Sequence, residues 1–139
     1  PSRARAGHGL QDPVAHAGRT AGNTHLLHVY GRHDPYAPEA TQRLIAAATR
    51  GTLAVPAPVP AWFDLLSELA MDTGPLPISG NVAGGEGTVA TLEVLNDPAG
   101  TEDGEPYDGH FVVFRDTAAR AQVRAWLDAL RTEDVPTLR

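Results

Sequence analysis

The segment from Leu26 to Pro38 constrains the fold more than any other part of this chain. It reads LLHVYGRHDPYAP, an apolar run that ends at Gly31 and is followed by Asp34 and a proline. A short apolar run bounded by glycine is typical of a strand buried on both faces, as in a parallel sheet. Proline suits the first turn of a helix, where its missing N–H would have no partner. The segment therefore predicts a strand over 25–30 and then a helix, which is half of a βαβ unit.

The rest of the pattern extends this α/β prediction. In the helix after Pro38, small and apolar residues share one face, and Gly51 is a plausible stop. A second strand is predicted over 88–95, where apolar residues have β-branched neighbours. The final helix is predicted over 117–130, with Asp116 or Thr117 as its cap. The predicted apolar faces are Ala40, Leu44, Ala47 and Ala48 in the earlier helix and Val123, Trp126, Leu127 and Leu130 in the last one.

The remaining segments read as connections. Residues 1–24 have little periodicity and are predicted to be a linker or loop, so the folded domain is 25–139. A proline-rich extended connector over 51–61 is followed by a short amphipathic helix over 61–71. Glycine, proline and asparagine predict a loop over 74–87, a polar loop follows over 96–109, and the last residues are expected to fray.

Composition limits the classes of protein that fit. A chain of 139 residues with 42% hydrophobic content is one domain with enough apolar side chain for a core. The net charge of −6 argues against a general nucleic-acid role. No apolar run approaches the roughly 20 residues of a membrane span, and the absence of cysteine excludes disulfides and thiolate zinc sites. Arginine is the basic residue throughout, which with abundant alanine, glycine and proline fits a GC-rich bacterial genome.

Two side chains suggest a catalytic function. Asp34 follows one predicted strand, and His110 stands in the sequence Asp108-Gly109-His110-Phe111, after the other predicted strand and before the last helix. Nucleophilic acyl transfer uses a histidine whose tautomer and charge are stabilised by a carboxylate. The carboxyl ends of strands in an open α/β sheet hold such groups rigidly while leaving them accessible.

These two segments resemble those of the α/β-hydrolases. Gly31 to Pro38 matches the G-x-x-D-x-x-x-P segment that carries the acid of the catalytic triad, and Gly109-His110 resembles the segment that carries the histidine, in the same order. The resemblance covers about residues 25–50 and 88–131. It implies the C-terminal part of a parallel sheet with flanking helices, and an esterase-like or lipase-like enzyme. Asp34 would be the acid and His110 the base, the substrate would be a small-molecule or lipid ester, and neither a cofactor nor a metal ion would be needed.

The sequence departs from that family in two ways. The nucleophile segment Gly-x-Ser-x-Gly is absent, because Ser2, Ser67 and Ser79 all have other neighbours. We therefore expect the serine and the oxyanion hole in a preceding N-terminal portion of the same hydrolase, with which this chain would associate, and we expect the chain alone to behave poorly. The interval of 76 positions between Asp34 and His110 also exceeds one crossover helix, so 51–87 is predicted to be an insertion.

Other interpretations remain open at this point. The long interval leaves Asp97 or Asp108 as alternative acids, although Asp108 also suits a turn. The chain could instead be a complete non-catalytic α/β binding or interaction domain, or a degenerate hydrolase retained as a scaffold. The spacing of His25, His28 and His33 along a strand alternates faces, which argues against a shared metal ion. The glycine-rich segment 81–87 lacks the lysine of a phosphate-binding loop.

Overall fold

The structure is a computed structural model, which describes residues 13–21, 24–54, 72–82, 85–133 and 135–139. Its described strands are β1 (Leu26–Gly31), β2 (Thr52–Ala54), β3 (Asp72–Gly74) and β4 (Val89–Val94). Its described α-helices are α1 (Pro13–Ala21), α2 (Glu39–Thr49), α4 (Val112–Arg115) and α5 (Thr117–Thr132). Two 3-10 turns, η2 (Pro98–Gly100) and η3 (Gly109–Phe111), follow β4.

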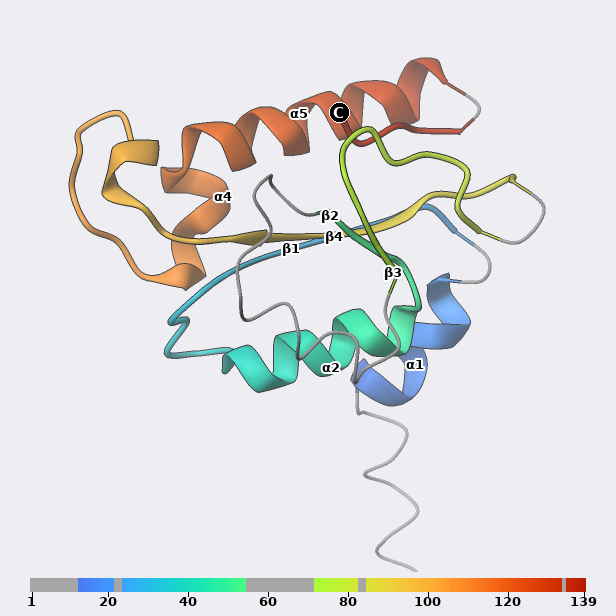
Figure 1. Cartoon of the computed structure of the whole chain (residues 1–139), viewed down its shortest axis with the longest axis horizontal. Coiled ribbons are helices and arrows are strands. Elements are labelled where there is room, and N and C mark those ends of the chain that lie inside the picture. The colour runs from blue at the N-terminus through green and yellow to red at the C-terminus, as the bar shows by residue number, and fades with distance from the viewer. Residues whose placement is uncertain (1–12, 22–23, 55–71, 83–84, 134) are drawn as a thin grey trace, which may run out of the picture.

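The strands form one parallel sheet in the order β1-β4-β2-β3. β4 pairs with β1 along its whole length, from Leu26 opposite Val89 to Gly31 opposite Val94. Parallel strands end at the same edge of a sheet, so the segments that follow β1 and β4 emerge side by side (Figure 1). The fold is therefore of the α/β class, as the sequence predicts.

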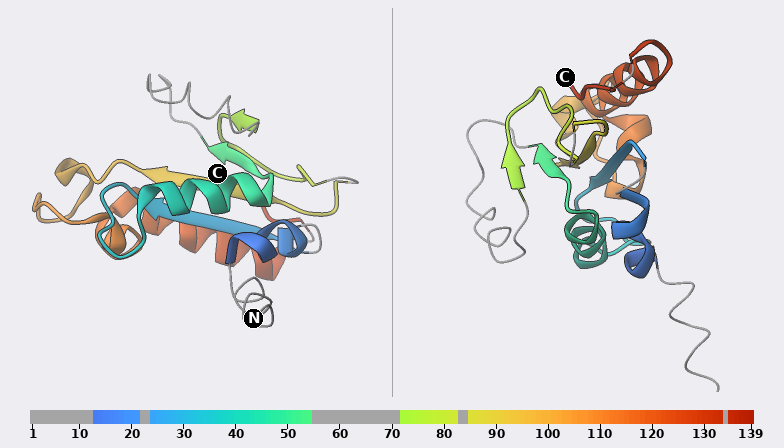
Figure 2. Two further views of the ribbon diagram at one scale, coloured as in Figure 1. Left: turned by 90° about the horizontal axis from the view of Figure 1, so that it is seen from below. Right: turned by 90° about the vertical axis from the view of Figure 1, so that its right-hand side faces the viewer.

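Helices cover both faces of this sheet. α5 lies along one face, while α1 and α2 lie together on the other (Figures 1 and 2). β4 is buried between these layers, with Ala90 and Thr91 fully inaccessible to solvent, as expected for an inner parallel strand. Beneath α5, the ring of Trp126 joins a core cluster with residues from the sheet, the following loop and the C-terminal segment: Ala54, Ile78, Ala90 and Leu138.

Local sequence signals account for the helix ends. The Asp116 carboxylate accepts a hydrogen bond of 2.7 Å from the Ala119 amide, so Asp116 is the N-cap of α5, one of the two residues predicted for this role. α2 begins at Glu39, so Pro38 is its N-cap rather than a residue of its first turn as predicted. It ends through Arg50, whose φ of 54° is left-handed, rather than at the expected glycine.

The N-terminal prediction of a linker or loop over residues 1–24 is wrong for Pro13–Ala21, which form α1. This helix has only 9 residues and would be marginal alone. It packs against α2, and that tertiary contact, which is not visible in the local sequence, accounts for its stability.

Two strands were also missed. β2 lies within the predicted extended connector, and β3 ends at Gly74, the first residue of the predicted loop over 74–87. Each has 3 residues, too few to show an alternating pattern. β2 is a strand because it pairs with β4 on one side and β3 on the other. The predicted helix over 61–71 lies outside the described residues.

The predicted apolar faces are partly wrong. In α5, Trp126 is 5% exposed as expected, but Leu127 is 54% exposed, and Ala129 is buried instead. In α2, Leu44 is 52% exposed while Ala46 is buried. Small residues face the sheet because they let the helices approach it closely, and the larger leucines then remain outside.

The C-terminal segment does not fray as predicted. Leu138 is fully buried, and its amide and carbonyl exchange two hydrogen bonds of 2.9 Å with Ile78. The carbonyl of Pro136 accepts a further bond of 2.6 Å from the Thr88 hydroxyl, directly before β4. These bonds tie the end of the chain to the core beneath α5.

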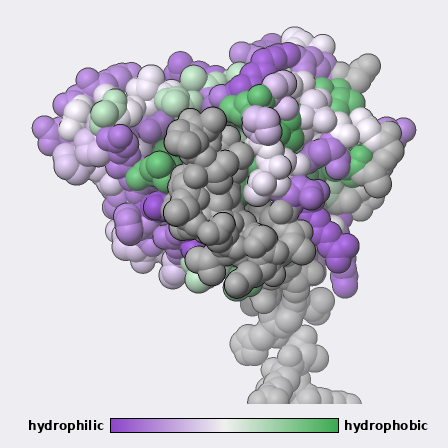
Figure 3. Space-filling model, viewed as in Figure 1, coloured by the Kyte–Doolittle hydropathy of each residue, from purple (hydrophilic) through white to green (hydrophobic). Residues whose placement is uncertain are grey.

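The surface in Figure 3 is mixed. Outside the grey region, apolar residues on this face gather in separate patches among polar ones. Within the described part of the chain, none of the helices has the length and apolar character needed to cross a bilayer.

Replacing Trp126 by alanine should reduce the free energy of unfolding by about 3–5 kcal/mol, because it empties the core beneath α5. The matched control is Leu127→Ala, which alters an exposed side chain one position along the same helix and should change that free energy by about 0.5 kcal/mol. Urea unfolding followed by circular dichroism measures both. Equal losses would contradict the assignment of the buried face.

Candidate active site

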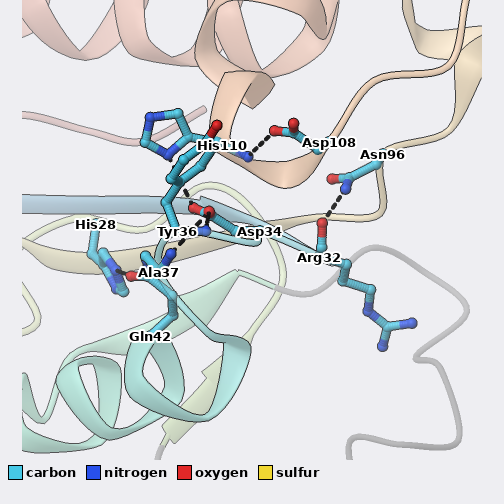
Figure 4. A network of polar contacts seen from close by, with 9 residues as sticks. All are labelled: His28, Arg32, Asp34, Tyr36, Ala37, Gln42, Asn96, Asp108 and His110. Carbon is cyan, nitrogen blue, oxygen red and sulfur yellow. Dashed lines mark hydrogen bonds and ion pairs between the residues drawn. The ribbon is translucent and has the colours of Figure 1, made fainter.

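The two residues singled out in the sequence meet at the carboxyl edge of the sheet. Asp34 lies in the loop after β1, and His110 lies in η3, which follows β4 through a longer loop. The imidazole Nδ1 of His110 lies 3.4 Å from the carboxylate Oδ2 of Asp34 (Figure 4). Residues that are 76 positions apart in the chain are thus brought into contact by the pairing of their strands.

The Asp34 carboxylate is held by its own turn. Its Oδ1 accepts hydrogen bonds from the backbone amides of Tyr36 at 2.8 Å and Ala37 at 2.9 Å. This leaves Oδ2 to face His110, and the side chain of Asp34 is only 7% exposed. A carboxylate that is fixed by two amides and shielded from solvent can orient an imidazole.

The same contacts keep Asp34 ionised. Burial alone would raise the pKa of this carboxyl, but the amides of Ala37 and Tyr36 and the imidazole of His110 outweigh burial and lower the pKa. An ionised carboxylate only accepts hydrogen bonds. The imidazole therefore has to carry its proton on Nδ1 to bond with Asp34, which leaves Nε2 with the free lone pair when the ring is neutral.

His110 is presented by a short capped turn. The Asp108 carboxylate caps η3 and accepts a bond of 3.0 Å from the backbone amide of His110. The imidazole packs against the ring of Tyr36, with centroids 4.7 Å apart, and against the edge of Phe111. Its side chain is 48% exposed, and Nε2 has no hydrogen-bond partner within the described part of the chain. That nitrogen is available to a reacting group.

Two glycines allow the two segments to approach. A Cβ atom on Gly31 would lie 2.6 Å from the Cα of Gly109, and a Cβ on Gly109 would lie 2.6 Å from the carbonyl carbon of Gly31. The side-chain amide of Asn96, which follows β4, donates to the carbonyl of Arg32 and closes the same junction (Figure 4). Only glycine fits at either point of contact.

The alternative acids have other roles in the structure. The carboxylate of Asp97 caps η2 by accepting from the Ala99 amide, and that of Asp108 caps η3. Each bonds a backbone amide, and neither makes the ring contact that Asp34 makes. The geometry therefore favours Asp34 as the partner of His110.

The other histidines of β1 and its flanks do not converge. The Nε2 of His28 pairs with the Gln42 side chain at 2.9 Å, and burial lowers the pKa of this histidine. His25 lies at the opposite end of the strand, where its Nδ1 accepts from the Thr88 amide. His33 is an exposed loop residue with a φ of 54°. Among the residues that the structure describes, no group of three or more potential ligands could hold a metal ion.

The sequence did not reveal the supporting residues. Tyr36 packs on His110, Asn96 bonds the Arg32 carbonyl, and Glu93 forms an ion pair of 2.6 Å with Arg32. Glu93 is nearly inaccessible and also accepts from the hydroxyl of Tyr30, whose pKa is raised by burial and by this carboxylate. A glutamate in an otherwise uncharged strand is a signal that could have identified this buried pair.

A separate cavity lies between β4 and α5. It has a volume of about 340 Å³ and is mainly apolar. Neither Asp34 nor His110 lines it. Most of its walls come from the end of β4 and the start of α5, including Leu92, Val94 and Gln122, and the rest come from Ala54 of β2 and from Leu76.

Comparison with known proteins adds no relative. No protein-family model matches the chain, and no curated protein and no solved structure matches it significantly. The fold class and the geometry of Asp34 and His110 therefore carry the functional argument.

Replacing Gly109 by alanine should lower the free energy of unfolding by about 2–3 kcal/mol, because the new methyl group overlaps the backbone of Gly31 and Arg32. Gly104→Ala is the control. Gly104 has a φ of 71° but open space around it, so its substitution should cost only the backbone strain of about 1 kcal/mol. Urea unfolding compares the two variants. An equal or smaller loss for Gly109→Ala would disprove the close contact.

The lowered pKa of Asp34 predicts an acid-dependent contribution to stability. A carboxyl whose pKa is lower in the folded state stabilises the fold fully above its ordinary pKa of 3.8, and this contribution is lost as the pH falls through the lower, folded value. Asp34→Asn should therefore cost about 1 kcal/mol near neutral pH, and the difference from the original protein should shrink in acid. Urea midpoints measured from neutral to acidic pH test this. The control is Asp128→Asn on the exposed side of α5, whose urea midpoint should stay close to that of the original protein. A loss of stability in Asp34→Asn that does not change with pH would refute the prediction.

Proposed function

We propose that this chain supplies the acid and the histidine of a serine hydrolase that acts on carboxylic esters, and that the nucleophile comes from polypeptide outside the chain. The observation that carries this proposal is the contact of 3.4 Å between His110 Nδ1 and Asp34 Oδ2 at the carboxyl edge of a parallel sheet. The alternative of a non-catalytic binding domain gives no reason for these two side chains to meet.

The roles of the residues follow from their protonation. The Nε2 of His110, as general base, would take the proton from a nucleophilic hydroxyl while that oxygen attacks the ester carbonyl. The imidazolium would then return the proton to the departing alcohol. The second half of the reaction repeats this transfer with water and releases the carboxylic acid. Throughout, the Asp34 carboxylate would stabilise the positive ring and hold Nδ1.

On this proposal the nucleophile comes from elsewhere, because none of Ser2, Ser67 and Ser79 stands in a Gly-x-Ser-x-Gly segment. Of these three, Ser79 is the serine that the structure describes, and it lies beside Gly80, whose amide donates to Thr88 at the start of β4. Asp34 and His110 lie past the other end of that strand. Ser79 is therefore separated from His110 by the length of the sheet, roughly 20 Å for six strand residues.

The outer edge of β1 offers a place for the rest of such an enzyme. β1 is the last strand on its side of the described sheet, and its sequence is that of an inner strand, mostly apolar, with none of the charges or prolines that protect sheet edges. Pairing with a further strand of the N-terminal portion of the same hydrolase would extend the sheet there. Small-molecule or lipid esters are the proposed substrates.

Ester hydrolysis by a protein that contains both this chain and the nucleophile-bearing portion tests the proposal. His110→Gln should lower kcat by about a thousandfold or more, because the hydroxyl loses its general base. His33→Asn is the matched control, since it removes a neighbouring exposed histidine and asparagine tolerates its left-handed backbone; its kcat should remain near that of the original protein.

A fluorophosphonate probe, which reacts with activated serines, provides an independent readout. Labelling should occur on the nucleophile-bearing portion, should weaken in His110→Gln, and should be absent from this chain alone. Near-normal turnover in His110→Gln, or labelling of Ser79, would disprove the proposed function.

A further inference from the structure

We propose that Tyr36 is a positioning residue that holds the His110 imidazole with Nδ1 toward Asp34 and Nε2 outward. The catalytic meaning of this role rests on the proposed function. The contacts that define the role exist in the folded chain without any reaction, so they can be tested separately.

The polar contact with Asp34 is too weak to fix the imidazole by itself. At 3.4 Å it is long for a hydrogen bond, and the His110 side chain is 48% exposed. The contact therefore contributes little to the stability of this arrangement, because one of its two partners is half-exposed. Rotation of a histidine ring about its last side-chain bond has broad energy minima. His110 also stands on a 3-10 turn of 3 residues rather than within one of the packed helices or strands.

Tyr36 supplies the missing restraint. Its backbone amide donates to Asp34 Oδ1 at 2.8 Å, so the turn that fixes the carboxylate also fixes this residue. Its ring lies 4.7 Å from the imidazole, centroid to centroid, at an angle of 54° (Figure 4). Phe111 meets the imidazole edge-on at 5.2 Å. The two aromatic rings restrict its rotation, and the Tyr36 ring comes from the same turn as the acid.

The ring of Tyr36 has no comparable role in the core. Tyr36 is 72% exposed. Among the described residues, its ring contacts the ring of His110 and no other aromatic ring. Phe114 is equally exposed at 72% and follows the same 3-10 turn, but it makes no ring contact with His110 among the described residues. The chain therefore contains its own control, an aromatic side chain with the same exposure and without the contact.

This orientation of the ring selects one of the two neutral tautomers of His110. When the imidazole is held with Nδ1 toward the ionised carboxylate, its neutral form carries the proton on Nδ1 and the lone pair on Nε2. A general base acting at Nε2 needs that tautomer. Without Tyr36 the ring should turn away from Asp34, and the other tautomer should become populated.

Long-range ¹H–¹⁵N NMR of the folded chain tests this, with His110→Gln identifying the imidazole signals. The spectra are recorded in mildly basic buffer, where the ¹⁵N shifts of Nδ1 and Nε2 distinguish the two neutral tautomers from each other and from the charged ring. The original protein, Tyr36→Phe and Phe114→Ala should show the tautomer with the proton on Nδ1. In Tyr36→Ala the ratio of this tautomer to the other should fall by about threefold to tenfold, the effect expected of one aromatic contact.

Three outcomes would overturn the role: an unchanged tautomer in Tyr36→Ala, the same loss in Phe114→Ala, or the same loss in Tyr36→Phe, which keeps the ring. Backbone amide spectra verify folding; if Tyr36→Ala does not fold, Tyr36→Leu removes the ring while keeping apolar bulk and is read in the same way. Absence of ester hydrolysis alongside an intact tautomer effect would refute the proposed function alone. An unchanged tautomer ratio in Tyr36→Ala, together with ester hydrolysis that depends fully on His110, would refute the role of Tyr36 alone.

Discussion

The close contact between the backbones of Gly31 and Gly109 is the constraint on which the carboxyl edge of the sheet depends. The gap between them has no room for a Cβ atom on either residue. Gly31 ends β1 and Gly109 begins η3, so their contact joins the two segments that leave the sheet side by side. Asp34 and His110 follow directly, and little chain remains to be ordered before their side chains meet.

The side chains of Asp34 and His110 are positioned mainly by their rigid surroundings, because the polar contact between them is weak. Amides of the turn hold one oxygen of Asp34 and leave the other for the imidazole. The carbonyl of Arg32 is bonded by Asn96, and its guanidinium, which extends away from the pair (Figure 4), bonds the buried Glu93. The loop that carries the acid is thus anchored on β4 through both backbone and side chain. A site built on such a loop keeps its geometry although its histidine is half-exposed.

Much of the candidate site could be predicted from the sequence because its signals are local. Asp34 follows a strand that ends in glycine, and His110 follows a glycine and an aspartate that caps its turn. Tyr36 could not be recognised, because its importance depends on a ring that is distant in the sequence. The same holds for Glu93, since only the register of β1 against β4 places it beside Tyr30 and Arg32. The register between two strands that are distant in the chain cannot be derived from a single sequence.

The sequence by itself determined the α/β class, β1, β4, α2 and α5, and the two residues that meet at the strand ends. Apolar runs, caps and turn residues act over a few neighbouring positions, so they can be interpreted without a partner. Only the tertiary structure decided that α1, β2 and β3 form, that small residues face the sheet, and that Leu138 is buried. Each of these depends on contact with a segment far along the chain, and the free energy that stabilises it arises only when the two segments have come together.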